Sequence, residues 1–244
     1  MRARELAIAV AIGAFGLGAC QGRADDGAFG ARVRAYLLAH PEVIQEAAQR
    51  LQVKMAVDDA AAQRRALTNL PAHRAALERD ARDFVANPAG PITVTEFYDY
   101  RCPHCENAAP RVIALIKANP DVRFVFKEMP IFGPTSEHAA RAAIAVKKAN
   151  GDYLRFYQTL MATKALDDGA IDRIARAEGA RSAGLAPNRS ADAQIADVTA
   201  LFNALALDGT PTFIVGDEII PGEDMDAVSA AIARLRAGAS TRRG

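Results

Sequence analysis

The first part of the chain carries apolar residues at steps of three and four. They are Phe29, Val33, Leu37, Ile44, Ala48, Leu51 and Met55. This spacing places them along one face of a helix. Pro41 falls at a first helical position, where its missing N–H costs no hydrogen bond. We therefore predict one helix near 27–39 and a longer one from about 41 to 66. A break at Leu70-Pro71 and a further helical piece to about Ala81 follow.

β-branched and aromatic residues replace this pattern near residue 84. Phe84-Val85-Ala86 and the run from Ile92 to Tyr98 predict two strands, with turn-forming residues between them. An apolar periodic segment follows and predicts a helix that ends at Asn119-Pro120. The run from Val122 to Phe126 predicts the next strand, which completes a βαβ unit.

The rest of the chain is predicted to be helical and then to form a hairpin. Helical periodicity extends from Ser136 to about Leu207, with breaks expected at Gly151, Gly169, Gly179 and Gly184. Thr212–Val215 and Glu218–Ile220 flank Gly216-Asp217, a hairpin signal. A last helix is expected at about 224–237. The predicted fold class is therefore α/β, with a βαβ unit, a helical insertion at about 136–207 and a ββα unit.

Residues 1–24 have the pattern of an export signal. Arg2 and Arg4 precede an uncharged apolar run from Leu6 to Ala19. This run is shorter than the roughly 20 residues that a comfortable membrane span needs. No later run is as long and apolar, so we expect the mature protein not to span a membrane.

Two ways of processing this signal remain open. Gly22-Arg23-Ala24 offers small residues where ordinary signal peptidase needs them. Leu17-Gly18-Ala19-Cys20 instead resembles a bacterial lipobox, which would make Cys20 a lipidated N-terminus.

Charge and cysteine content narrow the function classes. The formal charge is +1, from 30 basic and 29 acidic residues, so we expect no nucleic-acid partner. Cys20 lies in the signal, which leaves Cys102 and Cys105 as the only cysteines of the mature chain. A disulfide between residues so close in sequence closes too small a loop to stabilise a fold much. The pair therefore points to chemistry.

Redox chemistry fits this pair better than structural zinc. Zinc needs two further ligands, and the other histidines are scattered. Cys102 is predicted at the first turn of a helix, where unpaired N–H groups and the helix dipole stabilise a thiolate. His104 can add a donor or a positive charge. We expect Cys102 to be the exposed attacking thiolate, and Cys105, one turn on, to face inward and resolve the mixed disulfide.

Residues Glu96 to Cys105, Glu-Phe-Tyr-Asp-Tyr-Arg-Cys-Pro-His-Cys, resemble the DsbA-like branch of the thioredoxin superfamily. The resemblance covers roughly residues 84–240. It implies a thioredoxin fold with a helical insertion, and a redox-active disulfide Cys102–Cys105 around Pro103-His104 with no other cofactor.

The same resemblance assigns roles to two further places. Thr210-Pro211, just before the hairpin, matches the family's cis-proline step and implies that the Thr210 backbone meets the substrate. Glu96 matches an acid that lies buried beneath the disulfide and assists proton transfer with Cys105. From the strand pattern alone, Glu96 could equally face solvent, as its neighbours Thr93, Thr95 and Asp99 suggest.

Residues Val33 to Ala47 are similar to the N-terminal region of the suppressor of copper sensitivity C (ScsC) proteins. This similarity weakens through 56–83. It implies an α-helical oligomerisation region and linker over 25–83, and a homotrimer held through about 27–56. The implied function is a periplasmic disulfide isomerase, linked to copper tolerance and acting on misfolded or disulfide-bonded exported proteins. A membrane thiol reductase of the ScsB or DsbD type would keep it reduced.

Other interpretations stay open at this stage. The N-terminal helices could pack on their own domain, and the protein would then be a monomeric DsbA-like dithiol oxidase. The thiolates of Cys102 and Cys105 could also bind Cu(I), since soft sulfur ligands suit that ion.

Overall fold

The computed structural model describes residues 21–181 and 185–241. Most of the predicted export signal, with the lipobox at Cys20, lies outside these residues, as does the break predicted at Gly184. Within the described residues, no helix combines the length and apolar character that crossing a membrane requires. The chain divides into two compact units, one up to Val57 and one from Asp58.

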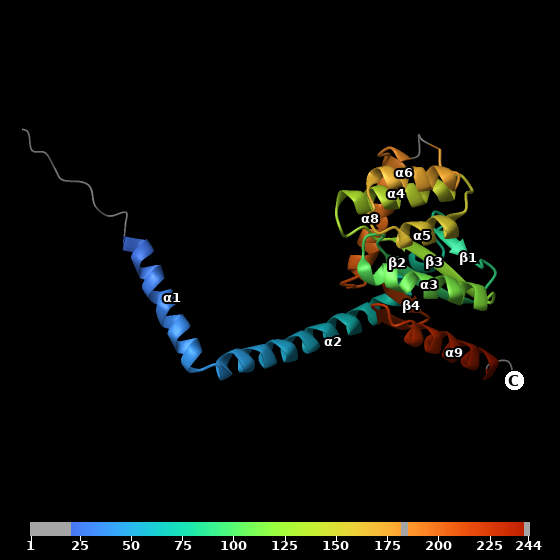
Figure 1. The fold of residues 1–244 in the computed structure, drawn as a ribbon. Coiled ribbons are helices and arrows are strands. Elements are labelled where there is room, and N and C mark those ends of the chain that lie inside the picture. The colour runs from blue at the N-terminus through green and yellow to red at the C-terminus, as the bar shows by residue number, and fades with distance from the viewer. Residues whose placement is uncertain (1–20, 182–184, 242–244) are drawn as a thin grey trace, which may run out of the picture. The chain divides into compact units, whose positions relative to one another are not determined.

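The first unit is helical and leaves its apolar side chains exposed. It contains α1 (Gln21–Ala39) and the first part of α2 (Glu42–Glu78), which are separated at His40-Pro41 as predicted (Figure 1). Exposed large apolar side chains include Phe29, Val33, Tyr36, Leu38, Ile44, Leu51, Val53, Met55 and Val57.

The second unit is built on a five-stranded sheet in the order β1-β3-β2-β4-β5. The parallel pair β2 and β3 forms its centre, and the other neighbouring strands pair antiparallel. The strand bounds are β1 Phe84–Ala86, β2 Ile92–Tyr98, β3 Val122–Glu128, β4 Thr212–Val215 and β5 Glu218–Pro221.

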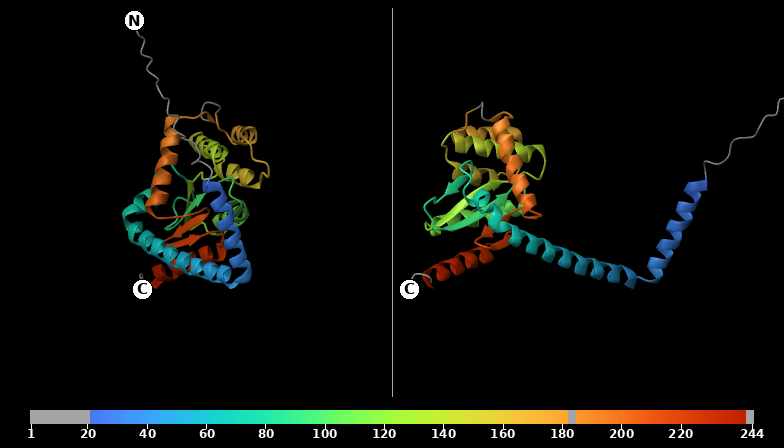
Figure 2. Two further views of the ribbon diagram at one scale, coloured as in Figure 1. Left: turned by 90° about the vertical axis from the view of Figure 1, so that its left-hand side faces the viewer. Right: turned by 180° about the vertical axis from the view of Figure 1, so that it is seen from behind.

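The helices of this unit confirm a thioredoxin fold with a helical insertion. The helix α3 connects β2 to β3. Four helices, α4, α5, α6 and α8, lie between β3 and β4 along the chain, and α9 follows β5. Figures 1 and 2 show α4, α5 and α6 gathered together, with the sheet beside them. The bounds are α3 Pro103–Ala118, α4 Pro134–Lys148, α5 Tyr153–Ala162, α6 Asp168–Ala177, α8 Arg189–Ala204 and α9 Met225–Thr241.

The break predicted at Gly169 is wrong. Gly169 lies in the first turn of α6, which begins earlier because the Asp167 side chain accepts a hydrogen bond from the Ala170 N–H at 2.7 Å. Such a cap satisfies a donor that the helix itself leaves unpaired.

Each face of the sheet carries its own apolar cluster. The larger cluster includes Val94, Tyr98 and Phe126 from the strands, with residues of α3, α4, α5 and α9. The smaller cluster lies on the opposite face and includes Phe97, residues of α8, and Leu70 and Leu77 of α2. The central strands are therefore covered on both sides, and β2 sends alternate side chains to the two clusters.

The second half of α2 belongs to this unit. The break predicted at Leu70-Pro71 is wrong, because the helix continues through Pro71 to Glu78. The linker expected in this part of the chain is also wrong, because residues 66–77 contribute to the core. A proline inside a helix costs about 3 kcal/mol. Burial of Leu70 and Leu77 offsets that cost, at about 1.5–3 kcal/mol for each side chain.

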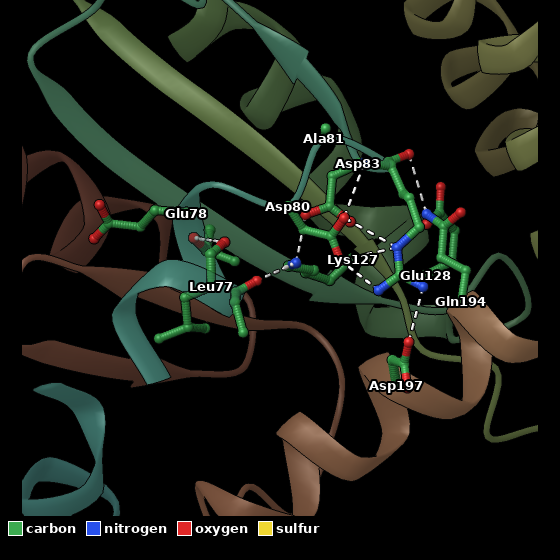
Figure 3. Close-up of polar contacts among 12 residues, drawn as sticks. Leu77, Glu78, Asp80, Ala81, Asp83, Lys127, Glu128, Gln194 and Asp197 are labelled. Carbon is green, nitrogen blue, oxygen red and sulfur yellow. Dashed lines mark hydrogen bonds and ion pairs between the residues drawn. The ribbon is translucent and has the colours of Figure 1, made fainter. Parts of the chain in front are cut away.

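Side chains from the sheet hold the C-terminal end of α2. Lys127, which is 1% exposed, donates to the Ala76 carbonyl at 2.6 Å and pairs with the buried carboxylate of Asp83 (Figure 3). Thr95 donates to the Leu77 carbonyl at 3.3 Å, and Arg123 donates to the Glu78 carbonyl. These carbonyls lack partners within the helix, so the sheet satisfies them.

We predict that Lys127→Met destabilises the protein by about 3–5 kcal/mol, because the change leaves a buried charge and a helix carbonyl unpaired. Urea unfolding monitored by circular dichroism measures this free energy. Arg234→Gln is the matched control, since its pair with Glu218 is solvent-exposed and should change the free energy of unfolding little. Equal effects of the two substitutions would contradict the role of Lys127.

Candidate dithiol active site

The cysteine pair lies where β2 gives way to α3. Cys102 is the extended residue that precedes the helix, and Pro103 is the first helical residue. The Cys102 N–H donates to the Asp99 carbonyl at 3.2 Å, and the Cys102 carbonyl accepts from the Glu106 N–H at 3.0 Å. Both Cys102 and Cys105 are free thiols in this structure.

Cys102 meets the loop that contains Thr210 and Pro211. The peptide bond between these two residues is cis, and the Cys102 thiol donates to the Thr210 carbonyl at 3.0 Å. This contact brings together residues 108 positions apart in sequence. Cys102 is only 2% exposed. The expectation of an exposed thiol is therefore wrong, because the sequence pattern around Cys102 contains nothing of the distant loop that lies against it.

The surroundings of Cys102 favour its thiolate. The pKa of Cys102 is lowered to about 5, and a hydrogen bond from the Cys105 thiol is the largest cause. The Thr210 side chain and the backbone N–H groups of Cys105 and His104 contribute to the same lowering, while burial opposes it. The Thr210 hydroxyl has no partner among the described residues in the dithiol form, so it is available to donate to the thiolate.

Cys105 differs from Cys102 in acidity, although both side chains are buried. It is fully buried, and burial raises its pKa far above the ordinary cysteine value, with the hydrogen bond to Cys102 acting in the same direction. At neutral pH the pair is therefore one thiolate and one thiol, with the charge on the sulfur that touches Thr210.

Glu96 lies in the apolar cluster on the α3 side of β2. It is 2% exposed, so the solvent-facing alternative is wrong. The Tyr157 hydroxyl donates to one carboxyl oxygen at 3.1 Å, and the other oxygen is buried without a partner in the described residues. Burial raises the pKa of Glu96 to about 8, and the Tyr157 hydrogen bond opposes this rise. The Glu96 charge raises the pKa of Cys105, so the two groups influence each other's protonation.

The sequence interpretation missed Asp99, which shapes the turn before Cys102. Its buried carboxylate accepts hydrogen bonds from the N–H groups of Arg101 at 2.7 Å, Ile131 at 2.6 Å and Phe132 at 3.1 Å. The Arg101 guanidinium in turn donates to the Phe132 carbonyl at 2.8 Å. A signal for the Arg101 contact was present, because an aspartate after a strand often accepts from the N–H two residues on.

The tyrosines around Glu96 were also missed. Tyr157 comes from α5, 61 residues away in sequence, and its ring packs edge-on against Tyr98 at 5.2 Å between centroids. The Tyr98 hydroxyl lies 3.0 Å from the Tyr100 hydroxyl and 2.6 Å from the Tyr153 hydroxyl. The Tyr153 hydroxyl donates to the Glu128 carboxylate. Burial raises the pKa of Glu128 to about 7. No local pattern in the sequence indicates these contacts.

His104 points away from the apolar clusters. Its side chain is largely exposed, and Nδ1 lies 3.3 Å from a carboxyl oxygen of Glu223. In the described part of the chain, no group of three or more His, Cys, Asp or Glu side chains is placed to hold a metal ion.

Two family models match the chain. The model described as DSBA-like thioredoxin domain matches residues 93–233. The model described as Copper resistance protein ScsC N-terminal domain matches residues 27–56.

Solved structures show the same similarity. A thioredoxin-like oxidoreductase from Silicibacter pomeroyi is 36% identical with a TM-score of 0.63, covering 67% of this chain and 98% of that one. ScsC of Proteus mirabilis in a transitional conformation is 26% identical with a TM-score of 0.65, covering 90% and 99%. A periplasmic thioredoxin-like protein from Salmonella enterica serovar Typhimurium is 27% identical with a TM-score of 0.61, covering 66% and 94%.

The curated relatives are much longer proteins. Na(+)/H(+) antiporter NhaA 3 of Salinispora tropica is 32% identical over 177 residues, which is 66% of this chain and 26% of the antiporter. NhaA 1 of Salinispora arenicola is 30% identical over 170 residues. The chain thus spans about a quarter of the length of these relatives.

We predict different outcomes for the two cysteine substitutions. Cys102→Ser should abolish insulin reduction, because it removes the attacking thiolate. Cys105→Ser should trap mixed disulfides on non-reducing gels, because it removes the thiol that releases them. In the wild type, absorbance at 240 nm should report a thiolate with a midpoint near 5. A midpoint near the ordinary value of about 8.5, or stronger trapping by Cys102→Ser, would contradict these assignments.

We also predict that Glu96→Gln changes how stability depends on pH. The unfolded carboxyl titrates near 4.5 and the folded one near 8. The unfolded chain therefore loses its proton first, and folding stability falls as pH rises from 4.5 to 8. Glu96→Gln should raise the free energy of unfolding by about 2–5 kcal/mol at pH 8 and change it little at pH 4.

Denaturant unfolding at both pH values measures this effect. Tyr157→Phe is the control, since it keeps the carboxyl and removes a donor that lowers its pKa. It should extend the loss of stability to higher pH. If Glu96→Gln shifted stability equally at pH 4 and pH 8, the titration of this carboxyl would not be the cause.

Proposed function

Because the chain belongs to the DsbA-like thioredoxin family, we propose that it is a thiol–disulfide oxidoreductase of exported proteins, and specifically a trimeric periplasmic disulfide isomerase. One observation supports the chemistry above all others. Cys102 and Cys105 lie in contact with opposite shifts in pKa, beside the cis bond of Thr210-Pro211. In this arrangement the Cys102 sulfur is a nucleophilic thiolate, and the Cys105 sulfur stays protonated until the mixed disulfide has formed.

The proposed reaction begins with the Cys102 thiolate. It attacks one sulfur of a substrate disulfide, forms a mixed disulfide, and releases the other substrate sulfur as a thiolate that takes up a proton. The negative charge on Cys102 is then gone, so the Cys105 thiol loses its proton more easily, and the ionised fraction of Glu96 can accept it. The Cys105 thiolate attacks Cys102 and expels the substrate. In total, the substrate disulfide is reduced and the protein dithiol is oxidised.

Isomerisation differs in its second half. A thiolate of the substrate itself attacks the mixed disulfide, so the substrate leaves with a rearranged disulfide and Cys102 returns as a thiolate. The enzyme then stays reduced, and a membrane thiol reductase of the ScsB or DsbD type would restore any molecules that became oxidised. Holding several catalytic units near one substrate raises their effective concentration and favours rearrangement over release.

The exposed apolar face of the first unit supports a trimer. Phe29, Val33, Leu37, Leu38 and Ile44 line a shallow groove there, and Leu51, Met55 and Val57 extend the exposed apolar surface along α2. Water-exposed apolar surface of this extent is typical of an interaction site. The residues that line this groove lie within 27–56, the segment that matches the ScsC N-terminal domain, and we propose that the apolar face serves self-association. The proposal of export to the periplasm rests on the leader that the sequence predicts at 1–24, with lipidation of Cys20 as a further proposal.

Copper binding is the second candidate function, favoured by the description of that matching domain as part of a copper resistance protein. Two soft sulfur donors at Cys102 and Cys105 fit Cu(I). A titration with Cu(I) beside an insulin reduction assay tests the two functions separately, because Cu(I) binding leaves the oxidation state of the two sulfurs unchanged and insulin reduction oxidises them to a disulfide.

We predict that the mature protein is a homotrimer by light scattering. Deleting residues 25–57 should leave a monomer that still reduces insulin but no longer rearranges scrambled disulfides. The deletion ends at Val57 because Ala66, Leu70 and Leu77 are buried in the second unit. It removes the apolar face and spares the core.

Point substitutions sharpen this test. Val33→Glu and Leu51→Glu should each dissociate the trimer, whereas Arg32→Glu, a change at another exposed position of α1, should not. An intact mature protein that is monomeric would contradict the isomerase proposal and support the monomeric oxidase.

A further inference from the structure

A polar contact joins His104 of the active-site motif to Glu223. The His104 Nδ1 lies 3.3 Å from Glu223 Oε1, and the two side chains are 67% and 40% exposed. His104 lies between the two cysteines, and its backbone N–H helps to lower the pKa of Cys102. Glu223 comes from the loop after β5, 119 residues further along the chain.

The loop that carries Glu223 is fixed at both ends. The Gly222 N–H donates to the Pro211 carbonyl at 2.8 Å, so the loop is joined to the cis-proline step that meets Cys102. Gly222 has a φ of 74°, a conformation that favours glycine. On the other side, the Asp224 side chain accepts from the Ala227 N–H at 2.9 Å and caps the start of α9. Glu223 is therefore held near His104 by its backbone.

The charges near this contact are distributed so that Glu223 acts on His104. Asp226, the next acidic residue on α9, pairs with Arg111. Glu106, in the first turn of α3, lies 3.9 Å from Lys164. Glu223 is the acidic residue within ion-pair distance of His104 in the described part of the chain. An imidazole N–H that donated to the neighbouring thiolate would stabilise it, and a carboxylate that holds the ring at Nδ1 competes with that contact.

We propose that Glu223 is a positioning residue that acts through His104 to make the Cys102–Cys105 centre less oxidising. The inference rests on the proposed dithiol–disulfide function and deepens it. By holding the His104 ring at Nδ1, the Glu223 carboxylate keeps this imidazole from donating to the Cys102 thiolate. The reduced protein is then stabilised less relative to its disulfide, so the protein gives up electrons more readily. A weaker oxidant remains in the dithiol form more easily, which is the form that attacks substrate disulfides.

The test is the equilibrium of the full mature protein with glutathione. In this reaction the protein disulfide and two glutathione thiols give the protein dithiol and one glutathione disulfide. Glu223→Gln should raise the equilibrium constant at pH 7 by about two- to fivefold, the range of an exposed ion pair. It should also lower the midpoint of the 240 nm thiolate absorbance. Glu223 is exposed, so this substitution leaves the core unchanged.

Two comparisons decide how Glu223 acts. In a His104→Gln background, Glu223→Gln should change the equilibrium constant by less than about 1.5-fold, because the residue through which it acts is gone. Asp226→Asn removes the same charge from the same region and should also change it by less than about 1.5-fold.

Three results would overturn the role of Glu223 alone, and a fourth would overturn the dithiol function on which it rests. An unchanged constant in Glu223→Gln excludes any effect of this carboxylate. A full effect that persists without His104 shows action through space, and an equal effect of Asp226→Asn shows a general charge effect. If the wild type formed no Cys102–Cys105 disulfide at any glutathione ratio, the dithiol function itself would fall, and the role of Glu223 with it.

Discussion

The pairing register between β2 and β4 fixes the active site. Glu96 lies opposite Phe213, and Phe97 lies opposite Thr212. The chain that leaves β2 toward Cys102 therefore runs beside the chain that enters β4 from Thr210-Pro211, and the Cys102 sulfur comes within 3.0 Å of the Thr210 carbonyl. A slip by one residue would turn Glu96 to the opposite face of the sheet. Burial of Val94 and Tyr98 on one face and Phe97 on the other makes such a slip costly.

This register also explains why the two thiols differ. Cys102 precedes the first turn of α3, where backbone donors and the Thr210 hydroxyl surround its sulfur. Cys105 lies one turn further along, inside the larger apolar cluster and on the same side of the sheet as Glu96. One sulfur is therefore placed to carry the charge, and the other to keep its proton beside a carboxyl group that burial leaves mostly neutral at pH 7. Cys102 can therefore stay a nucleophilic thiolate while Cys105 and most of the Glu96 carboxyl stay uncharged, so the core does not hold two negative charges.

The sequence predicted the elements that local residue patterns encode, and it did not predict the contacts that residues far apart in the chain make at the site. The strands, the helix after Cys102 and the hairpin follow from residue periodicity and turn residues. The partners of the site do not, because Tyr157 and Glu223 meet Glu96 and His104 across 61 and 119 residues. The exposure expected for Cys102 was wrong for the same reason, since Thr210 lies against it. Pro71 does destabilise the helix, as the local rule says, but the free energy gained by burying neighbouring α2 residues outweighs that cost.

The start of the catalytic unit is also set by contacts between distant residues and not by the local sequence pattern. Composition changes near residue 84, yet that point marks the first strand of the sheet and not the beginning of its core. Leu70 and Leu77 complete the smaller apolar cluster, and Lys127 finds its partners in Ala76 and Asp83. A unit that began at residue 84 would leave the Lys127 ammonium buried without either partner, which costs several kcal/mol. The second half of α2 is therefore an obligatory part of the domain that carries the dithiol, even though its sequence looks like a linker.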